Sequence, residues 1–439
     1  MENQFNTSLW GDEAFSAILS MKSIPQILEI ITRDTSPPLY NITEHLAFRL
    51  FGSSEAVIRG LSFFYYLIAV FFVYKIASYI WGKKAGYLAA AFTFFNPFFF
   101  IYAFEGRMYS ILAAGVTASM YFFLTQNWLG YIIATTAALY SHHFSIFALF
   151  IQGIIFLKYL IKKKERKNIK PMFLSFLVIG FLYIPWLMPL YKQTQMVASG
   201  FWLGTPTLAD LRELIYKYLA QGIANPLNQY ALYLVFGLLL LRDWTKKLWQ
   251  SGQVILWFLG PIIIVWLISQ KFQSVFYDRY LLYAIPAGMI IITTNLRKVS
   301  FVLLALLLPL FILIDWNYFT HPVKRPFKQL ASYIIENKKG DDFLINWNSA
   351  SHHIWESKYY GLDAPIYILG DRELPFFVGT ALMQKQDIIR QIPAKSPEGY
   401  TYQRVMAITS GPVDEVIIPL YTKGEYQQFG DLKAVWFEK

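Results

Sequence analysis

Cysteine is absent from the 439 residues, and charged residues are scarce. Without cysteine the chain has no disulfide framework, no thiolate metal ligand and no cysteine nucleophile. Charged residues make up only 15% of the chain, whereas soluble proteins carry about 25%. Hydrophobic residues reach 56%, and the mean hydropathy is +0.38. This balance excludes a soluble cytosolic enzyme and a disordered chain, and it predicts a protein that crosses a membrane several times.

Ten stretches are apolar enough to be predicted as membrane spans, since a spanning helix needs about 20 mostly apolar residues. They lie near residues 60–80, 85–103, 108–124, 129–141, 145–161, 171–190, 229–241, 252–269, 280–296 and 299–315. We therefore expect an all-α, polytopic membrane domain over residues 60–316. Residues 1–59 are expected to form a first outer loop with interfacial helices, and residues 317–439 a small extracytoplasmic α/β domain.

The predicted C-terminal domain has one helical segment and several short strands. Lys324–Asn337 shows helical periodicity. Short apolar runs separated by Gly, Pro and Asp indicate strands at Asp342–Ile345, Pro365–Leu369, Val405–Ile408 and Val416–Pro419.

Basic residues are concentrated in alternate loops, which predicts the orientation in the cell membrane. One set of loops holds Lys83, Lys84, the run from Lys158 to Lys170, Arg242, Lys246, Lys247, Arg297 and Lys298. Positive-inside bias places this set in the cytoplasm, so both terminal segments and the remaining loops are expected outside. The net charge of +11 then reflects topology and contact with anionic lipid; we do not expect a nucleic-acid partner.

Because residues 1–10 contain no apolar stretch that could initiate translocation, we expect a further helix encoded upstream of Met1.

Two acidic motifs are predicted in the first outer segment. Asp12 and Glu13 follow Trp10 at the start of an amphipathic stretch, where a partly desolvated carboxylate can serve as a general base. The alternative is an ordinary helix start, where acids are favoured. Asp34 precedes the Pro37-Pro38 pair, which makes a rigid elbow or, alternatively, a simple junction into a helix.

Three further polar motifs lie at outer ends of spans. Glu105, Arg107 and Tyr109 are close together between two spans, where ionisable groups are costly and often functional. The alternative is that Glu105 and Arg107 form a structural ion pair. Arg59, at the outer start of another span, can likewise be functional or structural. His142 and His143 could bind a divalent metal or be satisfied polar groups. Asp278, Arg279 and Tyr280 precede a span, so Arg279 can meet an anionic phosphate or simply anchor the helix.

The ordered set of these phrases resembles family 39 glycosyltransferases of the GT-C superfold, which include protein O-mannosyltransferases and the lipid A aminoarabinose transferase. It consists of Leu-Trp-Gly-Asp-Glu-Ala at 9–14, Asp-Thr-Ser-Pro-Pro-Leu-Tyr at 34–40, Phe-Gly-Ser-Ser-Glu at 51–55 with Arg59, and Glu-Gly-Arg-Met-Tyr at 105–109. The resemblance covers roughly residues 5–320. It implies transfer of one sugar from a polyprenyl-phosphate carrier to a protein, lipid or glycan acceptor on the extracytoplasmic face.

The resemblance maps the family's acidic pair onto Asp12 and Glu13, of which the aspartate acts on the acceptor. Displacement of a sugar from a lipid phosphate needs a base for the acceptor and cations for the leaving group. We therefore expect Asp12 as the base of one inverting displacement and Glu13 as a positioning group. The expected donor-phosphate residues are Arg59, Arg107, Arg279, Tyr109 and Tyr280. Those expected to position the sugar or acceptor are Asp34, Glu105, His142, His143 and Asp278.

A divalent metal is left open, with Asp34, Glu105 and His143 as the weak candidate ligands. Where the aminoarabinose enzymes read Glu-Lys-Pro-Pro, this chain reads Thr35-Ser36-Pro37-Pro38, so their proposed metal ligand has no counterpart.

The alternative to an enzyme is a multi-span carrier or flippase for lipid-linked sugars. Carriers prefer ionisable groups near the membrane midplane, whereas here the acids gather in the outer loops.

Overall fold

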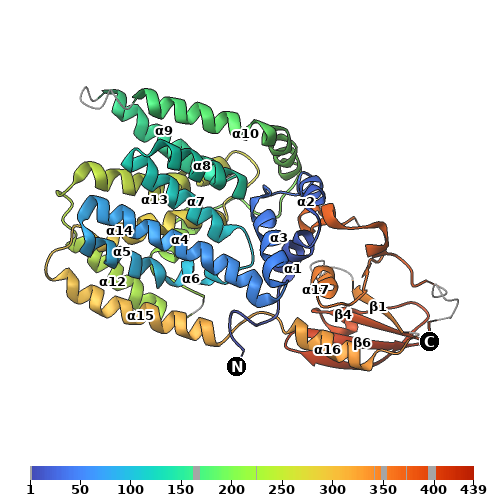
Figure 1. The fold of residues 1–439 in the computed structure, drawn as a ribbon. Helices are drawn as coiled ribbons and strands as arrows, with labels where there is room; N and C mark the ends of the chain where they lie inside the picture. The colour runs from blue at the N-terminus through green and yellow to red at the C-terminus, as the bar shows by residue number, and fades with distance from the viewer. Residues whose placement is uncertain are drawn as a thin grey trace. The chain divides into compact units, whose positions relative to one another are not determined.

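The computed structural model divides the chain into two compact units (Figure 1). It describes residues 2–161, 169–223, 225–340, 342–347, 353–371, 373–393 and 402–439. Unit 1 consists of Met1–Asp34, Asn41–Ile58 and Pro322–Lys439, and unit 2 of Thr35–Tyr40 and Arg59–His321. The first and last segments of the chain therefore fold together. Of the basic run predicted from Lys158 to Lys170, residues 162–168 lie outside the described part.

Unit 2 is built of helices, and each predicted span coincides with one or two of them. They are α4 (Glu55–Trp81), α5 (Lys83–Phe94), α6 (Pro97–Ala103), α7 (Tyr109–Thr125), α8 (Trp128–Ser141), α9 (Ser145–Ile161), α10 (Ile169–Ala198), α11 (Leu208–Ala220), α12 (Leu227–Leu241), α13 (Leu248–Ser269), the 3₁₀ helix η2 (Asp278–Ala284), α14 (Ile285–Thr293) and α15 (Ser300–Thr320).

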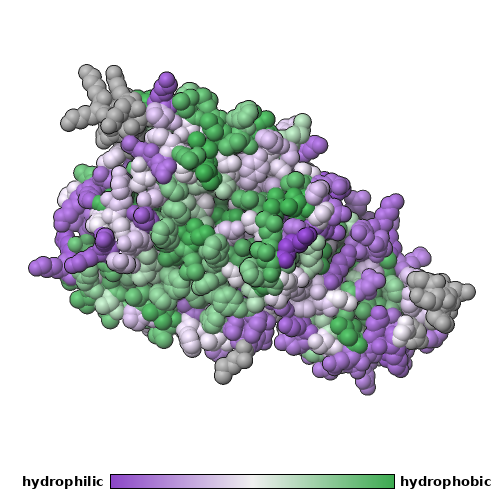
Figure 2. Space-filling model, in the orientation of Figure 1, coloured by the Kyte–Doolittle hydropathy of each residue, from purple (hydrophilic) through white to green (hydrophobic). Residues whose placement is uncertain are grey.

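Several of these helices can cross a membrane, but ten spans are not confirmed. Within the described residues, α4, α10, α13 and α15 are long and apolar enough to cross alone, and the bent pair α5–α6 makes a fifth candidate. The apolar helices α7 and α12 are shorter. Figure 2 shows apolar side chains gathered over the unit 2 helices, as a lipid-facing surface requires.

The predicted span over 85–103 is broken rather than continuous. Helices α5 and α6 meet at an angle of 68°. Asn96 precedes Pro97, and a residue before proline is disfavoured in the helical conformation. Asn96 is accordingly extended, with ψ of 118°, and its side chain accepts a hydrogen bond from the Phe99 amide at 2.9 Å to begin α6. The predicted span therefore corresponds to this bent pair, whose break the hydropathy pattern does not register.

The predicted span over 280–296 is also shorter than expected. It consists of η2 followed by α14, which has only nine residues, all of them buried. At the far end of α14, the buried Arg242 guanidinium donates to the carbonyl of Ile291 and to that of Thr294, the latter at 2.6 Å. A helix that is apolar on every side belongs to a protein core, so this stretch packs inside unit 2.

Unit 1 combines the N-terminal helices with the C-terminal domain. The N-terminal helices are α1 (Gly11–Ser20), α2 (Ile24–Ile31) and α3 (Leu39–Phe51). Helix α1 packs against α17 (His353–Tyr359), and the rings of Phe15 and Trp355 meet edge to face at 5.3 Å. Asn41 on α3 donates to Ser20 at 3.0 Å. The aromatic contact therefore joins residues 340 positions apart, whereas the Asn41–Ser20 hydrogen bond joins two of the N-terminal helices.

The C-terminal domain is a mixed six-stranded sheet in the order β3-β2-β1-β4-β6-β5. Strands β3, β2, β1 and β4 run parallel, and β6 is antiparallel to both β4 and β5. The strands are β1 (Asp342–Trp347), β2 (Ile366–Tyr367), β3 (Ile388–Ile389), β4 (Arg404–Thr409), β5 (Thr422–Phe429) and β6 (Leu432–Glu438). Helix α16 (Phe327–Asn337) packs on the sheet with Phe327, Leu330 and Ile334 in a shared core.

One predicted strand is wrong, and three strands, β3, β5 and β6, escaped prediction. Val416–Pro419 is not a strand; Val416 and Ile418 pack into the core on one side of the sheet from an irregular segment. Pro419 lacks a backbone donor, and Leu420 has a positive φ of 71°, so pairing cannot continue there. Strand β5 is exposed along almost its whole length, and its sequence contains no apolar run from which a strand could be predicted.

Candidate functional site

Three connecting segments of unit 2 contribute most of the predicted site residues. Glu105 and Arg107 lie in the turn between α6 and α7, where the Arg107 amide donates to the Glu105 carbonyl at 2.7 Å. His142 and His143 join α8 to α9, and Asp278 begins η2. Helix α7 packs against η2, so residues far apart in the sequence converge.

Aromatic rings surround the Arg279 guanidinium. It lies over the ring of Tyr277 at 4.8 Å and over that of Tyr109 at 5.5 Å. Tyr280, next in the chain, lies 5.1 Å from the His142 ring. Such contacts hold a cation in place electrostatically without neutralising its charge. We call Arg107, Tyr109, His142, Arg279 and Tyr280 the cationic cluster.

The pKa of His142 depends on the charges of this cluster. Burial lowers the pKa of its imidazole well below the usual value, and the charges of nearby Arg107 and Arg279 lower that pKa further. His142 is therefore neutral at physiological pH. Both arginines, like the neighbouring His143, therefore lie close enough to act on the His142 ring. Tyr102 lies within electrostatic range of Glu105, Asp278 and Arg279, so these carboxylates border the same cluster.

His143 points to different partners from its neighbour. Its Nε2 lies 2.7 Å from the Gln193 amide oxygen and its Nδ1 lies 3.2 Å from the Tyr183 hydroxyl, both on α10. Burial lowers the pKa of His143 to about 4, against a smaller opposing effect of Gln193. The two histidines do not converge on one point, and no three His, Asp or Glu side chains of the described residues form a group that could hold a metal.

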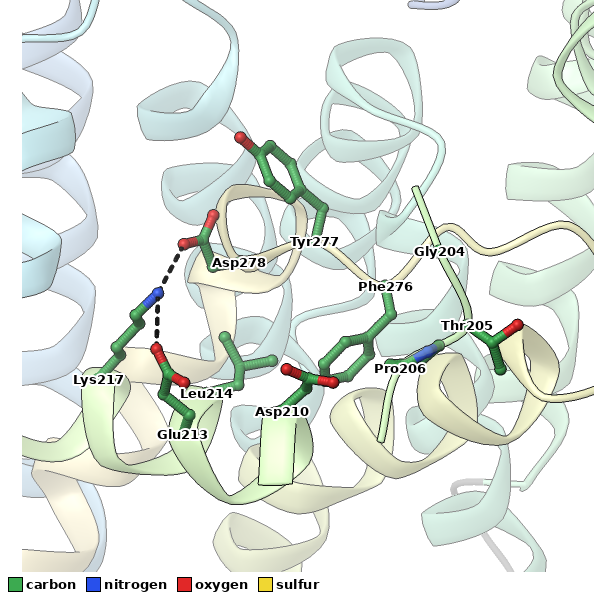
Figure 3. A pocket seen from close by; sticks show the side chains of 10 residues that line it. All are labelled: Gly204, Thr205, Pro206, Asp210, Glu213, Leu214, Lys217, Phe276, Tyr277 and Asp278. Atoms are coloured by element: carbon green, nitrogen blue, oxygen red, sulfur yellow. Dashed lines mark hydrogen bonds and ion pairs between the residues drawn. The ribbon is translucent and has the colours of Figure 1, made fainter. Parts of the chain in front are cut away.

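A cavity of about 360 Å³ lies beside η2 (Figure 3). It is lined by Gly204, Thr205, Pro206, Asp210, Glu213, Leu214, Lys217, Phe276, Tyr277 and Asp278. The Lys217 ammonium bridges the carboxylates of Glu213 at 3.5 Å and Asp278 at 3.4 Å. Because Tyr277 also stacks on Arg279, the cavity and the cationic cluster share one wall.

The cavity residues on α11 escaped prediction. Residues 191–228 were expected to be an outer loop, yet Leu208–Ala220 forms α11. Thr207 and Asp210 form a reciprocal capping box, with the Asp210 amide donating to the Thr207 hydroxyl at 3.2 Å and the Thr207 amide donating to the Asp210 carboxylate at 2.7 Å. A threonine followed three residues later by an acid is a readable helix-start pattern. That signal could have revealed Asp210, Glu213 and Lys217.

The acidic pair of α1 belongs to unit 1. The buried Glu13 carboxylate pairs with the Lys324 ammonium at 2.8 Å. It also accepts a longer hydrogen bond from the Trp10 amide at 3.4 Å, which closes the start of the helix. Asp12 precedes it and is half-buried. Glu13 therefore links the first helix to the segment that leads into α16.

Asp34 and Arg59 are also buried, in different units. Asp34 follows α2 in unit 1 and is 8% exposed. Arg59 lies on α4 in unit 2 and is fully buried. The structure thus gathers Glu105, Arg107, Tyr109, His142, Asp278, Arg279 and Tyr280 in unit 2, whereas Asp12, Glu13 and Asp34 lie in unit 1.

A buried carboxylate in the last membrane-type helix was not among the predicted residues. Asp315 on α15 is 3% exposed, and neither of its oxygens has a hydrogen-bond partner in the described part of the chain. It lies near one end of α15, which closes at Thr320. This position differs from the midplane sites typical of carriers.

Comparison with known proteins gives one family match and several similar structures. Residues 35–188 match the family model described as dolichyl-phosphate-mannose-protein mannosyltransferase. The fold resembles ArnT from Cupriavidus metallidurans in the apo state, with a TM-score of 0.66 and 13% identity over 99% of this chain and 95% of that chain. The structure of that ArnT bound to undecaprenyl phosphate gives a TM-score of 0.53 and 12% identity over the same shares.

A more distant structure shares the fold. The Archaeoglobus fulgidus oligosaccharyltransferase in complex with Zn and sulfate has a TM-score of 0.51 and 13% identity, over 91% of this chain and 64% of that chain. No curated protein matches the chain by sequence. At these identities the structural likeness shows a common fold.

Proposed function

Because residues 35–188 match the dolichyl-phosphate-mannose-protein mannosyltransferase family model, we propose that this multi-pass membrane glycosyltransferase moves one sugar from a polyprenyl-phosphate donor to an acceptor on the outer face of the membrane. The sidedness follows from the basic residues of the alternate loops, which positive-inside bias keeps in the cytoplasm. The acceptor is a protein, a lipid or a glycan.

The cationic cluster is the observation that carries this proposal. A phosphodiester leaving group gains negative charge as the glycosidic bond breaks, and guanidinium groups stabilise that charge with directed hydrogen bonds. Arg107 and Arg279 both act on His142, so their charges fall in one region. The rings of Tyr109 and Tyr277 both contact the Arg279 guanidinium and orient it. Arg59, fully buried on α4, is a further proposed phosphate contact. The undecaprenyl phosphate bound to the ArnT relative supports a lipid phosphate here.

The cavity beside the cluster suits the sugar of the donor. Its carboxylates, from Asp210, Glu213 and Asp278, can accept hydrogen bonds from sugar hydroxyls. Phe276 and Tyr277 supply apolar ring surface from the same wall, and Figure 3 shows Lys217 between the Glu213 and Asp278 carboxylates. A sugar in this cavity would keep its phosphate near Arg279. Glu105 and the neutral His142 border that region and are proposed to orient the sugar.

We assign the base to Asp12. The acceptor atom attacks the anomeric carbon, the bond from that carbon to the phosphate oxygen breaks, and the acceptor proton passes to the Asp12 carboxylate. Attack opposite the leaving phosphate gives inversion at the anomeric carbon. Glu13, held by Lys324 at 2.8 Å, positions the helix that carries Asp12, and Asp34 is proposed to orient the acceptor.

Substitution of Asp12 by Asn tests this assignment. We expect Asp12→Asn to reduce transfer from a radiolabelled polyprenyl-phosphate sugar by at least about 100-fold, since a positioned general base contributes about that much. The melting temperature should stay near that of the native protein. Asp414→Asn is the matched control, because Asp414 is fully exposed in the same unit and should retain native activity.

The outcomes separate the base from the alternative function. Native turnover in Asp12→Asn would contradict the role of Asp12. A native protein that moves the labelled donor across proteoliposomes without transferring its sugar would instead support the carrier.

A further inference from the structure

A serine, a histidine and a glutamate form a hydrogen-bonded row in the C-terminal domain. The Glu356 carboxylate lies 2.7 Å from Nδ1 of His353. On the other side of the ring, Nε2 of His353 lies 3.2 Å from the Ser410 hydroxyl. None of these residues belongs to the sugar-transfer site, and all three lie in unit 1.

The row lies where an open parallel sheet usually binds its ligand. The strand order places β1 between β2 and β4. From β1 the chain proceeds to β2 and β3 on one side of β1, and it returns at β4 on the other side. His353 begins α17, the helix that follows β1, and Ser410 directly follows Thr409 at the end of β4. Strands β1 and β4 are parallel, and both side chains therefore come from carboxyl ends at the switch in strand order. Ligands of such sheets bind in the crevice at this point.

The hydrogen-bond chemistry orders the row in one direction. An ionised carboxylate can only accept, so Nδ1–H of His353 donates to Glu356. The opposite nitrogen, Nε2, then carries the lone pair and accepts the hydroxyl proton of Ser410. Glu356 lies three residues after His353 in α17, a spacing that brings two side chains to one face of a helix.

Burial further distinguishes the roles of the three side chains. His353 is 1% exposed and Glu356 is 2% exposed, whereas Ser410 is half-buried. The ring of His353 also contacts the buried Phe327 at 5.7 Å. The base and its orienting carboxylate are thus shielded, while the hydroxyl is nearer to solvent. Serine nucleophiles are recognised by this geometry and not by their order along the chain.

We propose that Ser410, His353 and Glu356 form a second catalytic site, which cleaves carboxylic esters through an acyl-serine. The Ser410 oxygen attacks the ester carbonyl and its proton passes to Nε2 of His353. The bond from the acyl carbon to the alkoxy oxygen breaks, and that oxygen takes the proton from His353 and leaves as an alcohol. Water then attacks the acyl-serine, with His353 accepting and returning a proton, and the carboxylic acid leaves as Ser410 is restored.

Labelling with a fluorophosphonate probe tests the site directly, because the probe reacts with activated serine hydroxyls and releases fluoride. The full chain in detergent is treated with the probe, and the labelled peptide is identified by mass spectrometry. We expect a label on Ser410 that Ser410→Ala abolishes and that His353→Gln slows by at least about 100-fold. Hydrolysis of p-nitrophenyl acetate should fall in parallel. Glu356→Gln should slow both reactions with a smaller effect, since it changes the orientation of the base.

Ser332→Ala is the matched control, because Ser332 is exposed on α16 in the same domain. It should label like the native chain. If His353→Gln does not fold, the comparison of Ser410→Ala with Glu356→Gln decides, provided that both melt like the native protein. Absence of label on Ser410 in the native chain, or equal labelling in Glu356→Gln, would overturn the proposal. Sugar transfer should be native in Ser410→Ala, so failure here leaves the proposed glycosyltransferase reaction separately testable.

Discussion

Two charged groups, one in each unit of this protein, are held by different kinds of contact. In unit 1 the buried Glu13 carboxylate meets the opposite charge of Lys324 at 2.8 Å. In unit 2 the Arg279 guanidinium lies over two tyrosine rings and beside the region that contains Arg107. An ion pair satisfies both partners and stabilises the fold. Aromatic rings orient a cation by contact with its planar group, which suits the proposed binding of an anionic lipid phosphate.

The largest effect expected from this comparison is the loss of donor binding in Arg279→Ala. A hydrogen bond to a charged group contributes about 1.5–3 kcal/mol, so donor affinity should fall roughly 10- to 100-fold, with a smaller change in acceptor affinity. Arg279→Lys should recover only part of it, since an ammonium lacks the planar fork. Binding of a labelled polyprenyl-phosphate sugar measures both variants.

Arg212→Ala is the control for this substitution. Arg212 is exposed on α11 and also lies over a tyrosine, Tyr216, at 6.0 Å. Its removal should leave donor binding unchanged. Equal losses in Arg212→Ala and Arg279→Ala, or equal losses of donor and acceptor affinity in Arg279→Ala, would contradict the phosphate role.

An intermediate effect, on the free energy of unfolding, is expected when the ion pair between Glu13 and Lys324 in unit 1 is broken. Glu13→Gln leaves the nearly buried Lys324 without its counter-charge, which should lower the free energy of unfolding by about 3 kcal/mol. The double variant Glu13→Gln with Lys324→Met should recover most of that stability, because a buried pair can be replaced by apolar contacts. Chemical unfolding of the purified chain measures these changes.

The exposed pair of Glu29 and Arg33, 3.3 Å apart on the surface of the same unit, provides the control. Glu29→Gln should change stability by no more than about 0.5 kcal/mol. If the double variant Glu13→Gln with Lys324→Met still transfers the sugar, the role of Glu13 is to position its helix and not to take part in the chemistry. Native stability of Glu13→Gln together with lost transfer would instead place Glu13 in the chemistry.

The smallest effect concerns the pH dependence of His143. Its pKa in the folded protein is about 4, below the ordinary value of about 6.5. Above pH 6.5 the ring is neutral in both states. As the pH falls from 6.5 towards 4, the unfolded chain takes up a proton that the folded chain does not, so stability is lost in this window.

The melting temperature of His143→Gln should therefore decline less than that of the native protein between pH 6.5 and 4. A difference of a few degrees is expected, measured against His321→Gln, where the histidine is exposed at the end of α15. Parallel curves for the native protein and His143→Gln would show that His143 does not contribute to the pH dependence.

Much of unit 2 could be predicted from the sequence because the apolar runs dominate it. Residues that cannot enter a lipid phase are forced to the ends of these runs, and this alone singled out Arg107, His142 and Arg279. The break at Asn96–Pro97 could have been read from the proline rule. The capping box at Thr207 and Asp210 could likewise have revealed α11. Hydropathy alone registers neither feature.

The remaining features depend on contacts between distant residues. Nothing near Glu13 in the sequence indicates that Lys324 will neutralise it, since the two are joined only when α1 meets the C-terminal domain. The row of Ser410, His353 and Glu356 likewise forms only because β1 and β4 become neighbours in a parallel sheet. The apolar runs of Val416–Pro419 were misread as a strand because core residues need not lie in one.

The sequence by itself determined that this chain is a helical membrane protein and which polar groups remain at the ends of its helices, because burying apolar side chains and excluding charges from lipid depend on residue type alone. The tertiary structure decided which of those groups meet, since a distance between side chains is set by packing between elements remote in the chain. Tyr109 and Tyr277, 168 positions apart in numbering, share Arg279 for that reason.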